Sequence, residues 1–145
     1  MLTTMDKAPL NYPCVYVEVL VFNFGGALLI KNGMQGVGAS WGFPRAVQRQ
    51  GETMQQAAER VVQERCGVTI QATKVVNAYD QMVEFDDASE QQHQVVISVE
   101  GNYLGGEFTC DNETTMAAWA SGMALKTMDI DTTTMGTLSK LGFVD

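Results

Sequence analysis

One helix-forming segment, residues 51–67, lies between stretches that favour strands, and it constrains the fold more than any other part of the chain. Thr53 is a typical N-cap residue, and Gln56 three positions later completes a capping-box pattern. The residues that follow at helical spacing are Met54, Ala57, Ala58, Val61, Val62 and Arg65. Gly67 is well placed to end the helix. The pattern predicts an amphipathic helix over residues 54–65, and the spacing of Val61 predicts that it packs in the core.

Segments rich in β-branched and aromatic residues predict strands on both sides of this helix. The predicted strands cover residues 15–24, 27–31, 68–79 (as one or two strands) and 94–100, with a short extended piece at 41–44. Loops or turns are predicted at 25–26, 32–40, 85–92 and 105–106, and a closing helix at 132–141. The order of strands, helix, strands and helix is typical of an α+β fold, in which helices pack on the faces of a mixed sheet.

Length and charge narrow the classes of function. The chain has 145 residues, which predicts a single domain over 1–145 with a sizeable core. Its net charge is −8, with seven Lys/Arg against five Asp/Glu up to residue 74 and two against twelve after it. This acidic balance argues against long nucleic acid as a partner, because duplex binding depends on basic side chains that neutralise phosphates. A small phosphorylated ligand stays open, because one or two arginines suffice to bind it.

The sequence also predicts a cytoplasmic protein that does not enter a membrane. No apolar run approaches the ~18 residues that a spanning helix needs. The first residues, MLTTMDKAPLNYP, lack the basic and apolar segments of a secretory signal. The cysteines, at 14, 66 and 110, are scattered and form no CxxC pair, which argues against a disulfide framework or a zinc site and fits a reducing compartment.

The stretch WGFPRAVQRQGETMQQAAERVVQERCGV, residues 41–68, resembles the Nudix box, the signature of hydrolases that cleave nucleoside diphosphates linked to another group. The family pattern is G-x5-E-x7-R-E-U-x-E-E-x-G-U, where U is a bulky aliphatic residue. The matching positions are Glu52, Arg60, Val62, Glu64, Gly67 and Val68. The departures are Ala46 for the first Gly, Val61 for the Glu after the Arg, and Arg65 for the last Glu. Two carboxylates of the family's metal-binding cluster are therefore replaced.

The resemblance extends over nearly the whole chain. The segment HQVVISVEGNYLGGEF from His93, the later Trp119 and the segment GMALKTMDIDTTTMGTLSKL all resemble small Nudix proteins in order and spacing. The likeness implies a Nudix-type α/β/α sandwich with a mixed β-sheet. It also allows a homodimer, since Nudix proteins are often dimers.

In a working Nudix enzyme, the box carboxylates hold Mg²⁺ or Mn²⁺, which bridges the diphosphate of the substrate. The resemblance therefore implies Glu64 as the best remaining metal ligand and catalytic residue, with Glu52 as an outer ligand. It implies that Arg60 orients a glutamate. The residues themselves allow plainer roles, in which Glu64 pairs with Arg60 at i,i+4 and Glu52 stabilises the positive end of the helix.

Three arginines are candidates for contact with a ligand. A guanidinium at Arg65 would oppose a divalent cation about 6 Å away by several kcal/mol, even at an effective dielectric constant of about 20. Arg65 either contacts phosphate oxygens directly or is a solvated side chain near the end of the helix. Arg45 stands where the family usually has glycine, so we expect its loop to differ in shape. Arg49 lies close by in the sequence and completes the predicted set of ligand-binding residues.

Three further residues have open roles. The family often carries another acid a few positions before the Trp, but residues 114–118 contain none. Asp111 and Glu113 are the nearest candidates, and both also fit plain loop acids. His93 is either a general base that works near neutral pH or a structural residue at the entry of a strand.

Three functions follow from these observations. The first is a hydrolase with a reduced Mg²⁺ or Mn²⁺ site at Glu64 and Glu52, with weak or narrow activity. The second is a non-catalytic module that binds a nucleotide-like or phosphorylated ligand through Arg45, Arg49 or Arg65. The third is a scaffold or interaction protein that keeps only the fold.

Overall fold

The computed structural model describes residues 12–32, 40–84, 91–112 and 114–143. The strands are β1 (Cys14–Asn23), β2 (Gly26–Asn32), β3 (Trp41–Gly42), β4 (Arg45–Val47), β5 (Thr69–Glu84), β6 (Gln91–Gly105) and β7 (Thr114–Ala120). They form one sheet with the order β3-β2-β1-β6-β5, to which β4 adds beside β1 and β7 beside β2. Strands β1 and β6 run parallel, whereas the other pairs among the described strands are antiparallel. The predicted mixed sheet is therefore confirmed.

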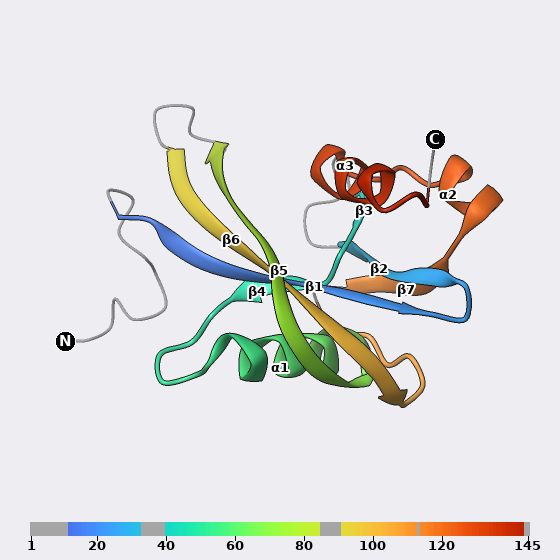
Figure 1. Cartoon of the computed structure of the whole chain (residues 1–145), viewed down its shortest axis with the longest axis horizontal. Helices are drawn as coiled ribbons and strands as arrows, with labels where there is room; N and C mark the ends of the chain where they lie inside the picture. Colours follow the sequence, from blue (N-terminus) through green and yellow to red (C-terminus); the bar gives the residue numbers. More distant parts are fainter. Residues whose placement is uncertain (1–11, 33–39, 85–90, 113, 144–145) are drawn as a thin grey trace.

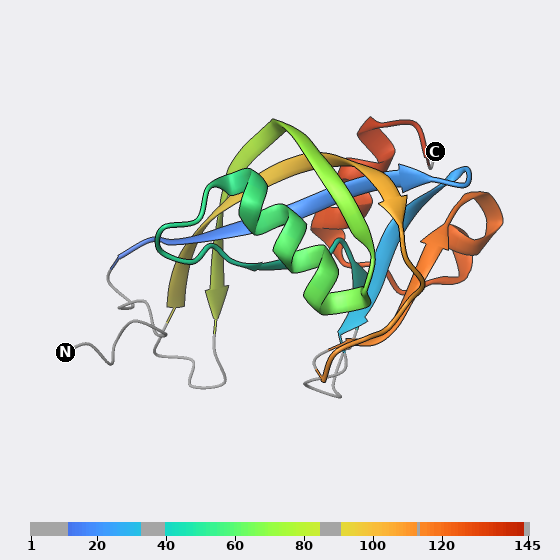
Figure 2. The same ribbon diagram turned by 90° about the horizontal axis from the view of Figure 1, so that it is seen from below.

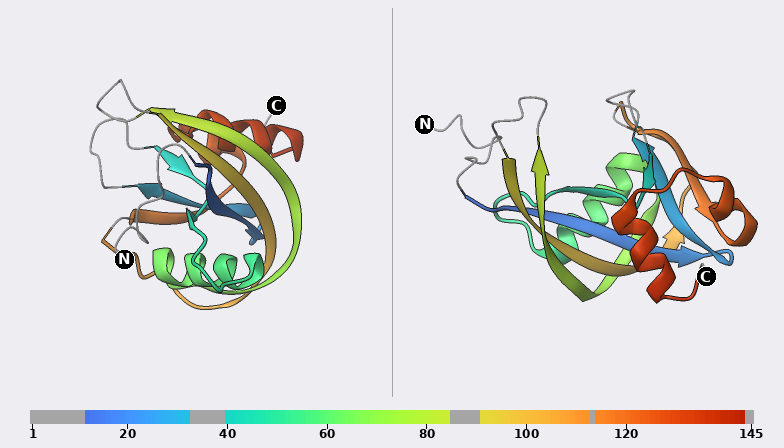
Figure 3. Two further views of the ribbon diagram at one scale, coloured as in Figure 1. Left: turned by 90° about the vertical axis from the view of Figure 1, so that its left-hand side faces the viewer. Right: turned by 90° about the horizontal axis from the view of Figure 1, so that it is seen from above.

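Helices cover both faces of this sheet. Helix α1 (Met54–Cys66) lies on one side, while α2 (Gly122–Thr127) and α3 (Thr132–Lys140) lie on the other (Figure 1). The left-hand view of Figure 3 shows the three layers end on, with strands between α1 and α3. This arrangement is the predicted α/β/α sandwich. Within the described ranges, no helix has the length and apolar character needed to cross a bilayer.

Strand β1 carries side chains to both layers, because successive residues of a strand point to opposite faces. Val17, Val19 and Val21 are fully buried in the cluster beneath α1. Leu20 is buried in the other cluster, where Phe22 packs at its border beside residues of α3. A strand that is apolar on both faces belongs in the middle of a layered fold, and β1 occupies that place.

Helix α1 forms as its sequence predicts. Thr53 accepts a hydrogen bond from the Gln56 backbone, and the Gln56 side chain accepts one from the Thr53 backbone, so the capping box is complete. Gly67 ends the helix with φ of 78°, a left-handed conformation that glycine adopts without strain. Val61 is fully buried, as predicted. Met54 is 41% exposed, so the first position of the apolar pattern is not part of the core.

The structure departs from the predicted elements in its second half. Strands β5 and β6 are longer than predicted, and they bend together around α1 at three register shifts (Figure 2). Of the loop predicted at 85–92, residues 85–90 lie outside the described chain, and Gln92 belongs to β6. Gln92 pairs with Val83 in the ladder, and its buried side chain accepts a hydrogen bond from Gln94 Nε2 at 2.8 Å. Strand β7 and the short α2 were not predicted, whereas α3 matches its predicted range closely.

Candidate functional site

An arginine–glutamate pair ties helix α1 to the loop that precedes it. The Arg60 Nε lies 2.5 Å from Glu52 Oε2, and Arg60 Nη2 donates to Glu52 Oε1 at 3.0 Å. The same guanidinium donates to the Val47 carbonyl at 2.9 Å, which ties α1 to the preceding loop. Both side chains are largely covered, at 15% and 14% exposed. The hydrogen bonds from Arg60 hold the pKa of Glu52 below its ordinary value, despite the opposing effect of burial.

Glu64 lies at the edge of this pair and is half-exposed. Its carboxylate accepts from Arg60 Nη1 at 3.2 Å and lies 3.5 Å from Arg49 Nη1. Glu52 and Glu64 therefore share Arg60 and are drawn together by its positive charge. Arg49 is exposed and is not among the residues that line the pocket described below.

These donors do not fit a divalent cation. A hard cation needs several oxygen ligands that converge on one point. Among the residues that the structure describes, no group of three or more His, Cys, Asp or Glu side chains converges in this way. The two box carboxylates face guanidinium groups, and Arg65 brings a further positive charge to the position where the family pattern has a glutamate.

Arg65 follows Glu64 in the last turn of α1 and pairs with the loop before β7. Its Nη1 lies 3.1 Å from Asp111 Oδ2, and the Asp111 backbone nitrogen donates to the Arg65 carbonyl at 3.3 Å. The Arg65 side chain is only 19% exposed, so it is not a fully solvated residue at the helix end. The fold thus brings the predicted loop acid to the box, where its partner is an arginine. The alternative acid, Glu113, lies outside the described residues.

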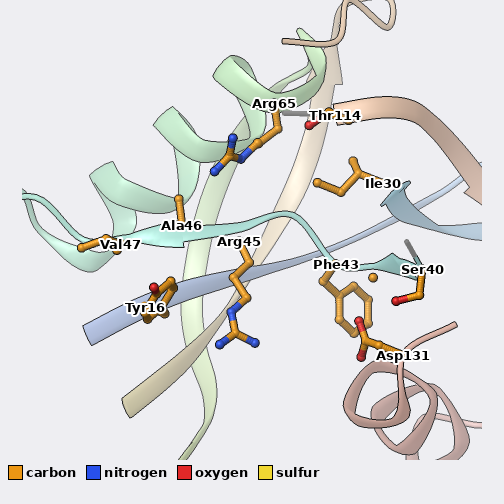
Figure 4. Close-up of a pocket in the computed structure, with 11 residues that line it drawn as sticks. Tyr16, Ile30, Ser40, Phe43, Arg45, Ala46, Val47, Arg65, Thr114 and Asp131 are labelled. Carbon is orange, nitrogen blue, oxygen red and sulfur yellow. The ribbon is translucent and has the colours of Figure 1, made fainter. Parts of the chain in front are cut away.

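A cavity of about 470 Å³ opens beside this end of the helix. It lies where the β3–β4 segment passes between α1 and α3 (Figure 4). Its wall includes two cationic, two aromatic, two hydroxyl-bearing and one acidic side chain: Arg45, Arg65, Tyr16, Phe43, Ser40, Thr114 and Asp131. Of the three predicted ligand-binding arginines, the fold therefore brings Arg45 and Arg65 to one cavity and leaves Arg49 outside it.

Arg45 reaches the cavity from the face of the sheet opposite α1. It is paired in register with Glu18, whereas Ala46 beside it points towards α1 (Figure 4). The Arg45 guanidinium lies 5.0 Å from the centre of the Tyr16 ring, a cation–π distance, and it donates to Gln94 Oε1. The aromatic ring and the amide hold the guanidinium in a defined position at the cavity wall.

Asp131 forms the third side of the cavity. It is the N-cap of α3, and its Oδ1 accepts from the Thr134 backbone at 2.8 Å. Its Oδ2 lies directly over Gly42, so a side chain at that position would require the carboxylate to move.

A buried carboxylate borders the same wall. Glu18 is buried on β1 and accepts from Ser98 Oγ at 2.8 Å and from the Tyr79 hydroxyl at 3.0 Å. Burial raises the pKa of Glu18, although the two hydroxyl donors and the nearby Arg45 oppose the shift. Glu18 is not among the residues that line the cavity.

His93 has a different setting. It lies on β6 next to β5, and its Nε2 is 2.8 Å from Asp80 Oδ1. It is not among the residues that line the cavity. This position agrees with the structural alternative that the sequence left open.

Several residues of the wall were not predicted from the sequence, among them Tyr16, Asp131 and Thr114. Tyr16 lies within a predicted strand, where alternation alone could have indicated its face. Asp131 precedes the predicted last helix, and an N-cap signal at that point could have singled it out. Thr114 begins β7, which was not predicted as a strand. Its place in the window where the family often has an acid was the available signal.

Comparisons with known proteins agree with this architecture. A family model described as the NUDIX domain matches residues 13–135. A NUDIX hydrolase from Nitrosomonas europaea has a TM-score of 0.73 and 18% identity, with 90% of this chain and 88% of that chain covered. A MutT NUDIX hydrolase from Burkholderia pseudomallei has a TM-score of 0.72 and 21% identity, with 90% and 99% covered.

An ADP-ribose pyrophosphatase from Streptococcus suis has a TM-score of 0.65 and 18% identity, with 91% of this chain and 89% of that chain covered. Likeness at such identities concerns the fold. No curated protein sequence matches the chain. The family model spans most of the sequence. The box-like segment 41–68 of the chain forms α1 and the adjoining loops, and the strands and helices form the predicted sandwich. On this evidence the chain belongs to the Nudix family.

Proposed function

We propose that this protein binds a nucleotide-like ligand through its phosphate groups without a divalent metal and does not hydrolyse it. One observation carries the proposal. Arg65 lines the cavity at the position where the family pattern has a glutamate, while Glu52 and Glu64 are bonded to Arg60. The positive charge that a metal would bring to a diphosphate is thus supplied by the protein itself.

The chemistry of the wall supports a phosphorylated ligand with an aromatic or sugar part. Guanidinium groups present planar forks of donors that match phosphate oxygens, and Arg45 and Arg65 reach the cavity from different elements. The half-buried ring of Tyr16 offers apolar surface to the rest of the ligand, whereas Phe43 is almost fully buried. The Asp131 carboxylate on the wall is an acceptor for an amine or hydroxyl group. A cavity of about 470 Å³ is within the usual range for small-molecule sites.

A metal-dependent hydrolase is the second candidate. Its support is that Glu64 keeps its box position and remains half-exposed, and that the structural neighbours named above are called hydrolases or a pyrophosphatase. Under this alternative, Glu64 and Glu52 would have to release Arg60 before they could hold Mg²⁺ or Mn²⁺. The same experiment separates the two candidates.

The test is a thermal-shift series with ADP, ADP-ribose and inorganic pyrophosphate, each in EDTA, in Mg²⁺ and in Mn²⁺. A ligand present at about 100 times its Kd stabilises the folded state by about 2.7 kcal/mol, which corresponds to a rise in Tm of about 5–10 °C. We expect such a rise in EDTA, and we expect Arg65→Ala to remove it. Arg49→Ala is the matched control, because it removes an arginine outside the cavity.

Other outcomes favour the rivals. A shift that appears only with Mg²⁺ or Mn²⁺, together with product release that Glu64→Gln abolishes, would establish the hydrolase. The absence of a shift with all three ligands, from protein shown to be folded, would favour a scaffold role.

A further inference from the structure

The wall of the cavity contains a hydroxyl group that has no partner among the described residues. Thr114 is 4% exposed, and its Oγ1 is buried with no hydrogen-bond partner among the described residues. Buried polar groups in native proteins are nearly always hydrogen-bonded, because an unmade bond costs the full desolvation of the group. A buried hydroxyl without a partner on the wall of a cavity is therefore a candidate donor to a bound ligand.

Thr114 is held beside Arg65 by a short chain of backbone hydrogen bonds. Its backbone nitrogen donates to the Asp111 carbonyl at 3.2 Å, and the Asp111 nitrogen donates to the Arg65 carbonyl. Both side chains line the same cavity, and in Figure 4 Thr114 lies beside the base of the Arg65 side chain. The loop therefore places a neutral donor and a cationic donor on the wall of one cavity.

These two residues also stand where the family resemblance leads one to expect carboxylates. Position 65 is the last glutamate of the box pattern, and position 114 opens the window in which a later acid is expected. Carboxylates at both places would attract a cation and repel a phosphate. A guanidinium and a hydroxyl reverse this preference, because both donate hydrogen bonds to anionic oxygen.

We infer that the Thr114 hydroxyl and the Arg65 guanidinium bind one phosphoryl group of the ligand, in direct contact with its oxygens. The inference rests on the proposed function and deepens it. It assigns the position of the phosphoryl group, and it adds the Thr114 hydroxyl, a donor that carries no charge. Asp111 keeps the Arg65 guanidinium in place through the ion pair at 3.1 Å. The ligand class is a phosphate ester or diphosphate that enters without a bound divalent cation.

The experiment measures the affinity for inorganic pyrophosphate by calorimetry in EDTA, for the wild type and for two variants of position 114. Thr114→Val removes the hydroxyl and keeps the branched shape, whereas Thr114→Ser keeps the hydroxyl. We expect the valine variant to bind about tenfold or more weakly, because a hydrogen bond to a charged group is lost. The serine variant should stay within about threefold of the wild type, since its hydrogen bond to the charged group remains.

A second readout separates binding from structure. Without ligand, Thr114→Val should melt at the same temperature as the wild type or higher, because it removes an unpartnered buried hydroxyl. A matched control is Thr127→Val, since the Thr127 hydroxyl bonds to the Ala124 carbonyl on α2 and is outside the cavity. That variant should leave pyrophosphate affinity unchanged.

Wild-type affinity retained in Thr114→Val would overturn this inference and leave the proposed function intact, provided that Arg65→Ala still loses binding. A marked loss of stability in ligand-free Thr114→Val would also overturn it, because the hydroxyl would then have a structural partner. If the wild type binds neither pyrophosphate nor a nucleotide, the proposed function fails, and this inference fails with it.

Discussion

Helix α1 carries two charged clusters that differ in their surroundings. In the Arg60 cluster, one guanidinium bonds to Glu52 before the helix and to Glu64 one turn further along it. In the Arg65 cluster, the guanidinium pairs with Asp111 and borders a cavity with a buried hydroxyl that has no partner among the described residues. Glu52, Arg60 and Glu64 match the Nudix pattern. Arg65 departs from it, which indicates that the scaffold role and the metal role of the box are separable.

The largest expected effect comes from breaking the Arg60 cluster. Arg60→Ala leaves the largely covered Glu52 carboxylate without its guanidinium and removes the bond to the Val47 carbonyl. We expect a loss of about 2–4 kcal/mol in the free energy of unfolding, measured by urea denaturation. Pyrophosphate affinity, measured well below Tm, should change little. A large loss of affinity at unchanged stability would mean that the two clusters are not separable.

Reversing the charge at the C-terminal end should create a response to metal. Arg65→Glu removes the ion pair and places a second carboxylate beside that of Asp111. Because the two carboxylates repel each other, we expect the free energy of unfolding in EDTA to fall by about 1–2 kcal/mol. Mg²⁺ should recover part of this loss in the variant and should leave the wild-type Tm unchanged. A wild-type protein that Mg²⁺ stabilises without ligand would contradict the account of this end.

The buried acid behind the cavity wall sharpens the comparison through pH. The pKa of Glu18 is raised above its ordinary value of 4.5, so the folded state favours the protonated form. Stability from this group therefore rises as the pH falls from neutral through the raised pKa towards 4.5. Glu18→Gln should be more stable than the wild type at pH 8 by about 1 kcal/mol, and the difference should shrink on acidification.

Glu52 has the opposite sign, because its pKa is lowered and its contribution is lost only at pH below 4.5. Urea denaturation at pH 5 and pH 8 therefore reports on Glu18 rather than Glu52. A Glu18→Gln variant whose stability difference stays constant over this range would show that burial of the carboxylate carries no cost.

The smallest effect belongs to Arg49. Its side chain is 63% exposed, and its contact with Glu64 is long at 3.5 Å. Arg49→Ala should lower the free energy of unfolding by less than about 0.5 kcal/mol, as is usual for a surface ion pair. Denaturation and pyrophosphate titration of the same sample would check both properties. A loss of affinity would return Arg49 to the set of ligand-binding residues.

Local patterns predicted the elements whose signals lie within a few residues. The capping box and the C-terminal glycine located α1, and the hairpin signal located β1 and β2. Strand β7 was missed because its residues, TTMAAWA, include three alanines with low strand propensity. Its conformation comes from pairing with β2, which no local pattern reveals. Gln92 was placed in a loop for the same reason, since its polarity hides its place in the β5–β6 ladder.

The candidate site was predictable only in part. The box pattern pointed to Arg65 and to the loop containing Arg45, and both residues line the cavity. Thr114 and Asp131 come from elements far away in the chain, so their meeting with Arg65 depends on the assembled fold. The burial of Val61 also has a consequence for design. A glutamate restored there would enter the core as an unpaired charge, so metal binding is better sought with Arg65→Glu alone.

The most direct measurement is the calorimetric Kd of inorganic pyrophosphate for the wild type, first in EDTA and then in excess Mg²⁺. If Arg65 supplies the charge that a metal would otherwise bring, binding occurs in EDTA. It then stays equal or weakens in Mg²⁺, because the cation competes for the same phosphate oxygens. Binding that occurs only in Mg²⁺ would contradict this account and return the function to a metal-dependent hydrolase.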